Sequence, residues 1–153
     1  MITVVIPVFS SNFLEKAVNS VNKTSREFVS SIVIIMDDPS RRLPAIRSDI
    51  PIKTISNPVN LGAGPSRNIG VLFAGNEYIS FLDADDEFLE GRKEYYESIL
   101  KDNVNKCWCS DYKTSSERIV KSSTKKNLAE YLSNTNIGLS TITVRKEMFI
   151  NYG

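Results

Sequence analysis

The chain has 153 residues, a mass of 17.2 kDa and a net charge of +1, with 41% hydrophobic and 24% charged residues. These values are typical of a globular domain, and they argue against disordered and fibrous proteins and against nucleic acid as a partner. The chain contains no histidine. This absence excludes nucleophiles that depend on a histidine base and zinc sites of the usual Cys/His type, so any metal needs oxygen ligands.

Length and cysteine content favour one cytoplasmic domain over residues 1–153. No apolar run approaches the ~18 residues that span a bilayer, and Met1 to Val4 lack the basic region of a signal peptide. Cys107 and Cys109 are too few for a disulfide framework, which favours the cytoplasm as the default location. Their alternation in a strand would put both thiols on one face, where we expect core packing.

Uninterrupted apolar and β-branched residues predict buried strands. These strands cover residues 2–7, 32–36 and 78–82, and a further short strand is expected over 52–55. After the first strand, apolar residues recur at helical spacing. They are Leu14, Ala17, Val18 and Val21. Asn12 and Glu15 match a capping box at the start of this predicted helix.

Breaker residues between Asn57 and Pro65 predict a loop, with Pro65 in the first turn of a helix that ends near Ala74. We expect this helix to bury the stripe formed by Ile69, Leu72 and Phe73. Later in the chain we expect two helices and two strands. The helices cover residues 92–100 and 128–132, and the strands cover 106–112 and 139–144. Strands that alternate with helices predict an α/β fold with a largely parallel sheet.

Three of the predicted strands end in residues that suit ligand binding. They end in Pro7-Val8-Phe9, in Asp37-Asp38 and in Asp83-Ala84-Asp85-Asp86. Ligands of open α/β sheets bind at the carboxyl ends of the strands, so we expect the three ends to converge. In an extended segment Asp83 and Asp85 point to the same side. Two like charges ~4 Å apart cost about 4 kcal/mol at a dielectric of 20, a cost that a divalent cation removes.

Each of these features also has a purely structural interpretation. The acidic segment could be a solvated turn, Asp38 could form an Asx turn before Pro39, and Arg67 could be a surface arginine. The residues Asn60 to Gly64 match neither the G-x-G-x-x-G nor the Walker pattern. A basic run is expected to be a solvated loop or, alternatively, a contact for an anionic acceptor or a membrane surface. It contains Lys113, Arg118, Lys121, Lys125 and Lys126.

Four segments, in this order, resemble the motifs of the family 2 glycosyltransferases. They are 3–10, 34–40, 60–70 and 77–86. The stretch 138–145 also resembles the family's segment beyond the Asp-x-Asp strand. The resemblance covers nearly the whole chain and implies the GT-A fold, a Rossmann-like α/β/α arrangement with a mostly parallel central sheet flanked by helices.

The resemblance implies a nucleotide-sugar donor, with UDP as the expected nucleotide, and a saccharide or glycan acceptor. The backbone around Pro7, Val8 and Phe9 would hold the base, with the Phe9 ring against it. Asp38 would accept a hydrogen bond from the base, and Arg67 would also approach the base. A cytoplasmic enzyme of this kind could also sit at the inner face of the membrane.

The Asp-x-Asp motif would hold the rest of the donor, with Ala84 between the two carboxylates. By the resemblance, Asp83 hydrogen-bonds the ribose, and Asp85, with Asp83 as the second candidate, binds the Mn²⁺ or Mg²⁺ that bridges the diphosphate. The family is mostly inverting: an acceptor hydroxyl attacks the anomeric carbon as the nucleoside diphosphate leaves.

In the family, a Glu-Asp pair beyond the last motif supplies the catalytic base. The chain stops at Gly153 before such a pair, so we expect the base beyond Gly153 and a chain that is either a fragment or a natural truncation. A non-catalytic donor-binding fragment is one alternative. A phosphatase of the haloacid dehalogenase type is another, although its Asp-x-Asp sits on the first strand and a hydroxyl residue is expected where Glu87 stands.

Overall fold

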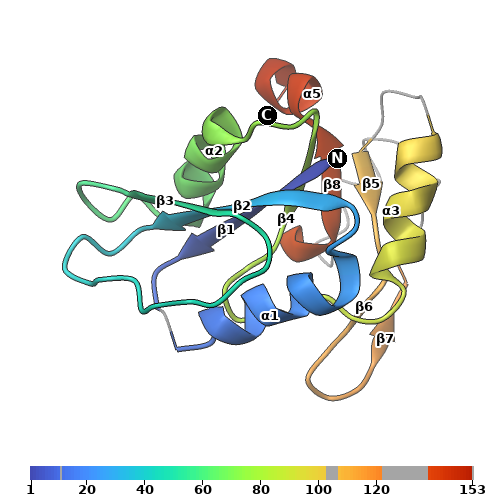
Figure 1. The fold of residues 1–153 in the computed structure, drawn as a ribbon, viewed down its shortest axis with the longest axis horizontal. Helices are drawn as coiled ribbons and strands as arrows, with labels where there is room; N and C mark the ends of the chain where they lie inside the picture. The colour runs from blue at the N-terminus through green and yellow to red at the C-terminus, as the bar shows by residue number, and fades with distance from the viewer. Residues whose placement is uncertain (11, 103–106, 122–137, 153) are drawn as a thin grey trace.

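A computed structural model describes residues 1–10, 12–102, 107–121 and 138–152. Its centre is a six-stranded sheet with the strand order β3-β2-β1-β4-β8-β5 (Figure 1). Four strands are mutually parallel: β1 (Ile2–Val8), β2 (Val29–Met36), β3 (Ile52–Ser56) and β4 (Tyr78–Phe81). β8 (Ile142–Arg145) is antiparallel to β4, and β5 (Cys107–Cys109) is antiparallel to β8. The predicted mostly parallel sheet is confirmed.

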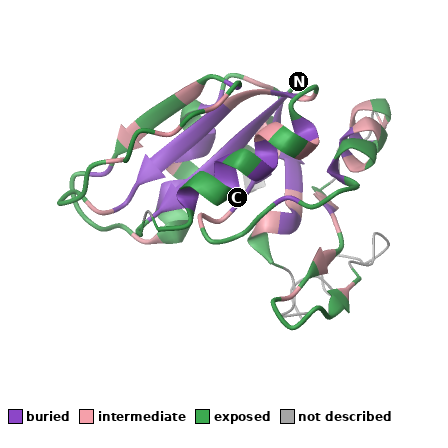
Figure 2. Ribbon diagram, turned by 60° about the horizontal axis from the view of Figure 1, so that its bottom comes forward, coloured by how far each residue is buried: buried purple, intermediate pink, exposed green. Residues whose placement is uncertain are grey.

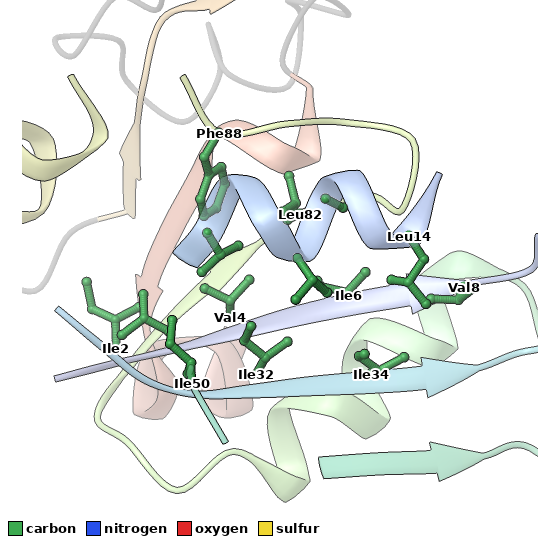
Figure 3. Packing of buried hydrophobic residues seen from close by; sticks show 14 of the residues in the cluster. Ile2, Val4, Ile6, Val8, Leu14, Ile32, Ile34, Ile50, Leu82 and Phe88 are labelled. Atoms are coloured by element: carbon green, nitrogen blue, oxygen red, sulfur yellow. The ribbon is translucent and has the colours of Figure 1, made fainter. Parts of the chain in front are cut away.

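Helices cover both faces of the sheet, because successive side chains of a strand point to opposite faces. On one face, Ile2, Val4, Ile6 and Val8 pack with α1 (Leu14–Ser25) (Figure 3). The same cluster includes buried residues of α3 (Arg92–Lys101). On the other face, Val5 packs with α2 (Ala63–Phe73) and α5 (Lys146–Tyr152). The strands β1 and β4 between these helices are entirely buried, and β2 is mostly buried (Figure 2). The expected α/β/α layering is confirmed.

Helix α2 lies close to β1 because a glycine faces the strand. A Cβ atom added to Gly70 would lie 2.3 Å from Cγ1 of Val5. The predicted buried stripe of this helix is wrong, since Leu72 and Phe73 are exposed and Ile69 is only half-buried. The buried positions are instead Ser66, Arg67, Gly70 and Val71. Gly70, which has no side chain, allows this face to approach β1 closely, so the more apolar stripe remains exposed.

The start of α1 also differs from the prediction. Its N-cap is Phe13, with no side-chain capping bond, so the capping box of Asn12 and Glu15 is wrong. The carbonyl of Phe13 accepts the first helical hydrogen bond from the amide of Ala17, at 3.1 Å. The backbone alone therefore starts this helix.

The predicted strand 106–112 is shorter and divided in the structure, and Lys106 lies outside the described residues. β5 ends at Cys109, and β6 (Tyr112–Lys113) pairs with β7 (Ile119–Val120) in a separate hairpin. Part of the basic run expected as a loop therefore forms this hairpin, while Lys125 and Lys126 lie outside the described residues. Cys109 is buried and Cys107 is exposed, so core packing holds only for Cys109.

The end of the chain contains a helix that the sequence did not predict, α5. Of the predicted strand 139–144, the first three residues form a 3₁₀ turn, η1 (Leu139–Thr141), because the amide of Thr141 donates to the carbonyl of Gly138 at 3.0 Å. The predicted helix 128–132 lies outside the described residues. Within the described ranges, every helix is too short or too polar to cross a bilayer.

Candidate functional site

The carboxyl ends of the parallel strands meet at one edge of the sheet, as the sequence predicts. Just beyond β2, the amide of Asp37 donates to the carbonyl of Val8 at 2.8 Å. Just beyond β3, the amide of Asn57 donates to the carbonyl of Met36, also at 2.8 Å. These bonds extend the ladder past the strands, so the polar residues that follow have fixed positions side by side.

Asp37 ties two strand ends to the start of α2. The residue is only 3% exposed, and its carboxylate accepts bonds from Nδ2 of Asn57 at 2.7 Å and from the amides of Leu61 and Gly62 at 2.8 and 2.7 Å. Asn57 Nδ2 also donates to Oγ of Ser66 at 2.9 Å. Burial alone would raise the pKa of Asp37, but these hydrogen bonds outweigh it and lower the pKa. Asp37 is therefore a structural anchor for the loop before α2.

Asp38 forms an Asx turn, which was the structural interpretation of this residue in the sequence. Its Oδ1 accepts from the amide and the hydroxyl of Ser40, at 3.0 and 2.6 Å, and its Oδ2 pairs with Nε of Arg41 at 2.9 Å. The Ser40 hydroxyl is the main cause of the lowered pKa of Asp38. At the neighbouring strand end, Phe9 is 58% exposed. Asp38 and Phe9 thus border the same edge.

Pro7 and Val8, the two residues before Phe9, are buried, whereas Phe9 is exposed. Only their backbone can face a ligand at this edge. The expectation that the main chain of these residues lines a binding site stays a prediction.

The acidic segment after β4 is a turn. The amide of Asp86 donates to the carbonyl of Asp83 at 3.0 Å, with Ala84 and Asp85 between them. The predicted extended alternation, which placed Asp83 and Asp85 on the same side, is therefore wrong. Asp85 is exposed and Asp83 is half-buried. Within the described ranges, no three acidic or cysteine side chains are grouped closely enough to form a metal cage.

Arg67 reaches across from α2 to the acidic turn. Its Nη2 pairs with Oδ1 of Asp83, and the two side chains are 10% and 32% exposed. The surface-arginine alternative is therefore wrong. The sequence placed both residues near one ligand but did not pair them. The available signal was an arginine in the first turn of the helix that leads into a strand ending in aspartate.

Ser140 fastens the acidic turn from a distant part of the chain. Its Oγ accepts from the amide of Asp83 at 2.9 Å and donates to Oδ2 of Asp86. Partial burial of the carboxyl group, together with the nearby Asp83 and Asp85, raises the pKa of Asp86 despite the bond from Ser140. The sequence resemblance included the segment of Ser140 but gave this residue no role.

A cavity of about 1090 Å³ opens beside the acidic turn. It lies between this turn, the start of α3, the end of β5 and the β6–β7 hairpin. Arg92 forms part of its wall, with its guanidinium 3.7 Å from the centre of the Phe88 ring and donating to Oγ of Ser110 and the carbonyl of Ser140, both at 3.0 Å. Asp85 and Asp86 of the acidic turn line this cavity, whereas Phe9, Asp38 and Asp83 do not.

The comparison to protein families agrees with the fold. Residues 3–147 match the model of the family described as Glycosyl transferase family 2. The chain belongs to this family. The resemblance drawn from the sequence motifs is confirmed.

Curated relatives carry the same class name. An uncharacterized glycosyltransferase of Haemophilus influenzae is 28% identical over 100% of this chain and 55% of its own length. An uncharacterized glycosyltransferase of Methanocaldococcus jannaschii is 30% identical over 67% of this chain and 38% of its own length. The chain thus spans about half the length, or less, of these relatives.

Solved structures share the fold. A crystal structure of S. aureus TarS 1-349 in complex with UDP-GlcNAc has a TM-score of 0.72 and 15% identity, covering 98% of this chain and 46% of that one. The complex of the same protein with UDP has a TM-score of 0.71 and 16% identity, with 98% and 48% coverage. At this identity the likeness shows the GT-A fold.

Proposed function

We propose that the chain is the donor-binding part of an inverting enzyme that transfers a sugar from a UDP-sugar to a hydroxyl of a saccharide or glycan acceptor. The observation that carries the proposal is the convergence of Phe9, Asp38 and the acidic turn at one sheet edge, in a chain that belongs to this family. The UDP and UDP-GlcNAc complexes of TarS, which has the same fold, support the choice of nucleotide.

In this proposal the nucleoside lies along the edge formed by the ends of β1, β2 and β4. The main chain of Pro7 and Val8 and the exposed ring of Phe9 hold the base. Asp38 accepts a hydrogen bond from the base, and Asp83 accepts one from the ribose. Each of these contacts uses a group that the strand ends hold in place, which lowers the ordering cost of binding.

The acidic turn suits a divalent cation that is shared with a diphosphate. Mg²⁺ is usually bound by one or two carboxylates together with substrate phosphates, and not by an all-protein cage. Asp85, which is exposed, and Asp83, which precedes it by two residues with Ala84 between them, provide such a set of carboxylate oxygens. When bound, Mn²⁺ or Mg²⁺ would neutralise charge on the departing nucleoside diphosphate.

The cavity lined by Asp85 and Asp86 is the proposed approach of the acceptor. In an inverting displacement the acceptor hydroxyl attacks the anomeric carbon from the side opposite the departing diphosphate. The bond from the acceptor oxygen to the anomeric carbon forms as the bond to the diphosphate oxygen breaks. We assign no residue of the described chain as the base that takes the hydroxyl proton.

Thermal denaturation with UDP and MnCl₂ tests the donor site. A ligand that binds only the folded state, at a free concentration of 100 times its Kd, stabilises that state by about 2.7 kcal/mol, so the melting temperature should rise. Asp85→Asn should remove the manganese-dependent part of the rise. Glu94→Gln, which changes an exposed carboxylate on α3, should keep it.

A wild-type chain whose melting temperature does not respond to any nucleoside diphosphate with manganese would contradict the proposal. Binding of a UDP-sugar without transfer, in the chain and also in a longer protein that contains it, would instead favour the non-catalytic donor-binding alternative.

A further inference from the structure

The guanidinium of Arg67 is buried and already engaged. Its side chain is 10% exposed, its Nη2 donates to Oδ1 of Asp83, and its Nε has no hydrogen-bond partner among the described residues. A buried cation needs a nearby anion, and removal of one partner leaves the other uncompensated. The position of Arg67 therefore depends on Asp83, and little of its surface is free for a ligand.

Both ends of this ion pair are held by further contacts. On the helix side, the neighbouring Ser66 accepts from Asn57, which also donates to the buried Asp37. On the strand side, the amide of Asp83 donates to Oγ of Ser140 at 2.9 Å. Hydrogen bonds thus hold the molecule on both sides of the Arg67–Asp83 pair, at Ser66, which precedes Arg67 in the chain, and at the backbone of Asp83.

A different arginine lies beside the candidate base contact. Arg41 pairs with Asp38 at 2.9 Å, and its side chain is 50% exposed. Arg41 is thus the cation next to the carboxylate that is proposed to face the base, whereas Arg67 is bound to the carboxylate proposed to face the ribose. In the proposed complex, Arg41 would therefore lie near the base and Arg67 near the ribose.

We infer that Arg67 is a positioning residue that aims the Asp83 carboxylate at the ribose, and that it does not read the base. This inference rests on the proposed function. It predicts that loss of Arg67 weakens the contact to the ribose hydroxyls and leaves discrimination between bases unchanged.

Calorimetric titration with four ligands in the presence of MnCl₂ tests the inference. UDP and CDP differ in the edge of the base, while 2′-deoxy-UDP and 3′-deoxy-UDP each lack one ribose hydroxyl. In the wild type, loss of the hydroxyl that Asp83 accepts should weaken binding by about tenfold or more, the scale of a hydrogen bond to a charged group.

We call this rise in Kd on loss of the ribose hydroxyl the deoxy penalty. In Arg67→Gln and in Asp83→Asn the deoxy penalty should nearly disappear, so that UDP and its deoxy analogue bind with similar Kd values. The ratio of the Kd values for CDP and UDP should stay at its wild-type value. The double variant should bind UDP no more weakly than the weaker single variant, because both changes remove the same interaction. Arg67→Lys, which keeps the charge, should retain part of the deoxy penalty and provides a second variant if Arg67→Gln does not fold.

The exposed pair Arg26–Asp49, at 3.0 Å near the opposite edge of the sheet, is the matched control. Arg26→Gln and Asp49→Asn should leave all four Kd values unchanged. A changed ratio between CDP and UDP in Arg67→Gln, or additive losses in the double variant, would overturn the inference. A wild-type chain that binds none of the four ligands would overturn the proposed function instead.

Discussion

Two aspartates at the same edge of the sheet have pKa values displaced in opposite directions. The pKa of Asp37 is lowered by the hydrogen bonds that its carboxylate accepts, and the pKa of Asp86 is raised by partial burial and by its acidic neighbours. A lowered pKa means that folding favours the ionised form, and a raised pKa means that folding disfavours it. The two residues therefore affect the free energy of unfolding with opposite signs at neutral pH.

We predict that Asp37→Asn lowers the free energy of unfolding at pH 7 by about 1–3 kcal/mol, because an amide group would face a backbone donor in a buried site. The Asp37 carboxylate contributes fully above the unfolded pKa of about 3.9, and this contribution is lost as the pH falls through the lower folded pKa. The difference between wild type and variant should therefore shrink in acid. Urea unfolding at a series of pH values measures it.

Asp86→Asn, the same substitution at the same edge, is the control with the opposite sign. The penalty on the Asp86 carboxylate is present above its raised folded pKa and absent below the unfolded pKa. This variant should be at least as stable as the wild type at pH 7. Equal destabilisation by both substitutions would show that the hydrogen bonds to Asp37 are not the source of its effect.

At the scale of the element, the packing of α2 on β1 decides where Arg67 can reach. Gly70 provides the close approach, and the same helix carries Arg67 one turn earlier. A helix that stood further from the sheet would also move the guanidinium away from Asp83. The stability of this contact and the geometry of the candidate site are therefore coupled.

Gly70→Ala should destabilise the protein by about 1–3 kcal/mol, because the new methyl group would overlap Val5 and push α2 outward. Gly64→Ala is the control within the same helix: its Cβ would meet nothing within 4 Å, and alanine is the better helix former by about 1 kcal/mol. Chemical denaturation of both variants measures the difference. Equal stability of the two variants would contradict the packing argument.

At the scale of the whole molecule, the elements that the sequence predicted are those whose signal is local. The apolar strands β1, β2 and β4 could be located because both of their faces are buried, and the convergence of the carboxyl ends follows from parallel pairing. The antiparallel pairing of β8 and β5 depends on contacts between distant segments, which residue patterns do not encode.

The predictions about the candidate site that were wrong or missing also concern contacts between distant segments. An ion pair between Arg67 and Asp83, a hydroxyl from Ser140 and the turn that replaces an extended acidic segment all depend on tertiary contacts. The sequence could name the residues of the acidic turn but not their partners. The buried face of α2 was predicted wrongly because close packing on β1 outweighed the more apolar stripe.

Hydrogen exchange should divide the molecule into a slow and a fast part. The amides of β1 and β2 lie in the middle of the sheet and are buried on both faces, whereas β6 and β7 form a two-stranded hairpin of two residues each. Opening of such a short, exposed pair costs little free energy. Mass spectrometry after deuterium labelling should show β6–β7 exchanging first, and comparable rates in both parts would contradict the described architecture.

The direction of β8 has a consequence for how the acidic turn is built. Because β8 runs opposite to β4, with Ser80 beside Thr143 and Tyr78 beside Arg145, the residues that enter β8 emerge next to those that leave β4. A strand of the other polarity would have delivered Ser140 to the far rim of the sheet. Strand polarity, and not distance along the chain, is what brings this hydroxyl to the aspartates, so a shift of β8 by one residue would detach it.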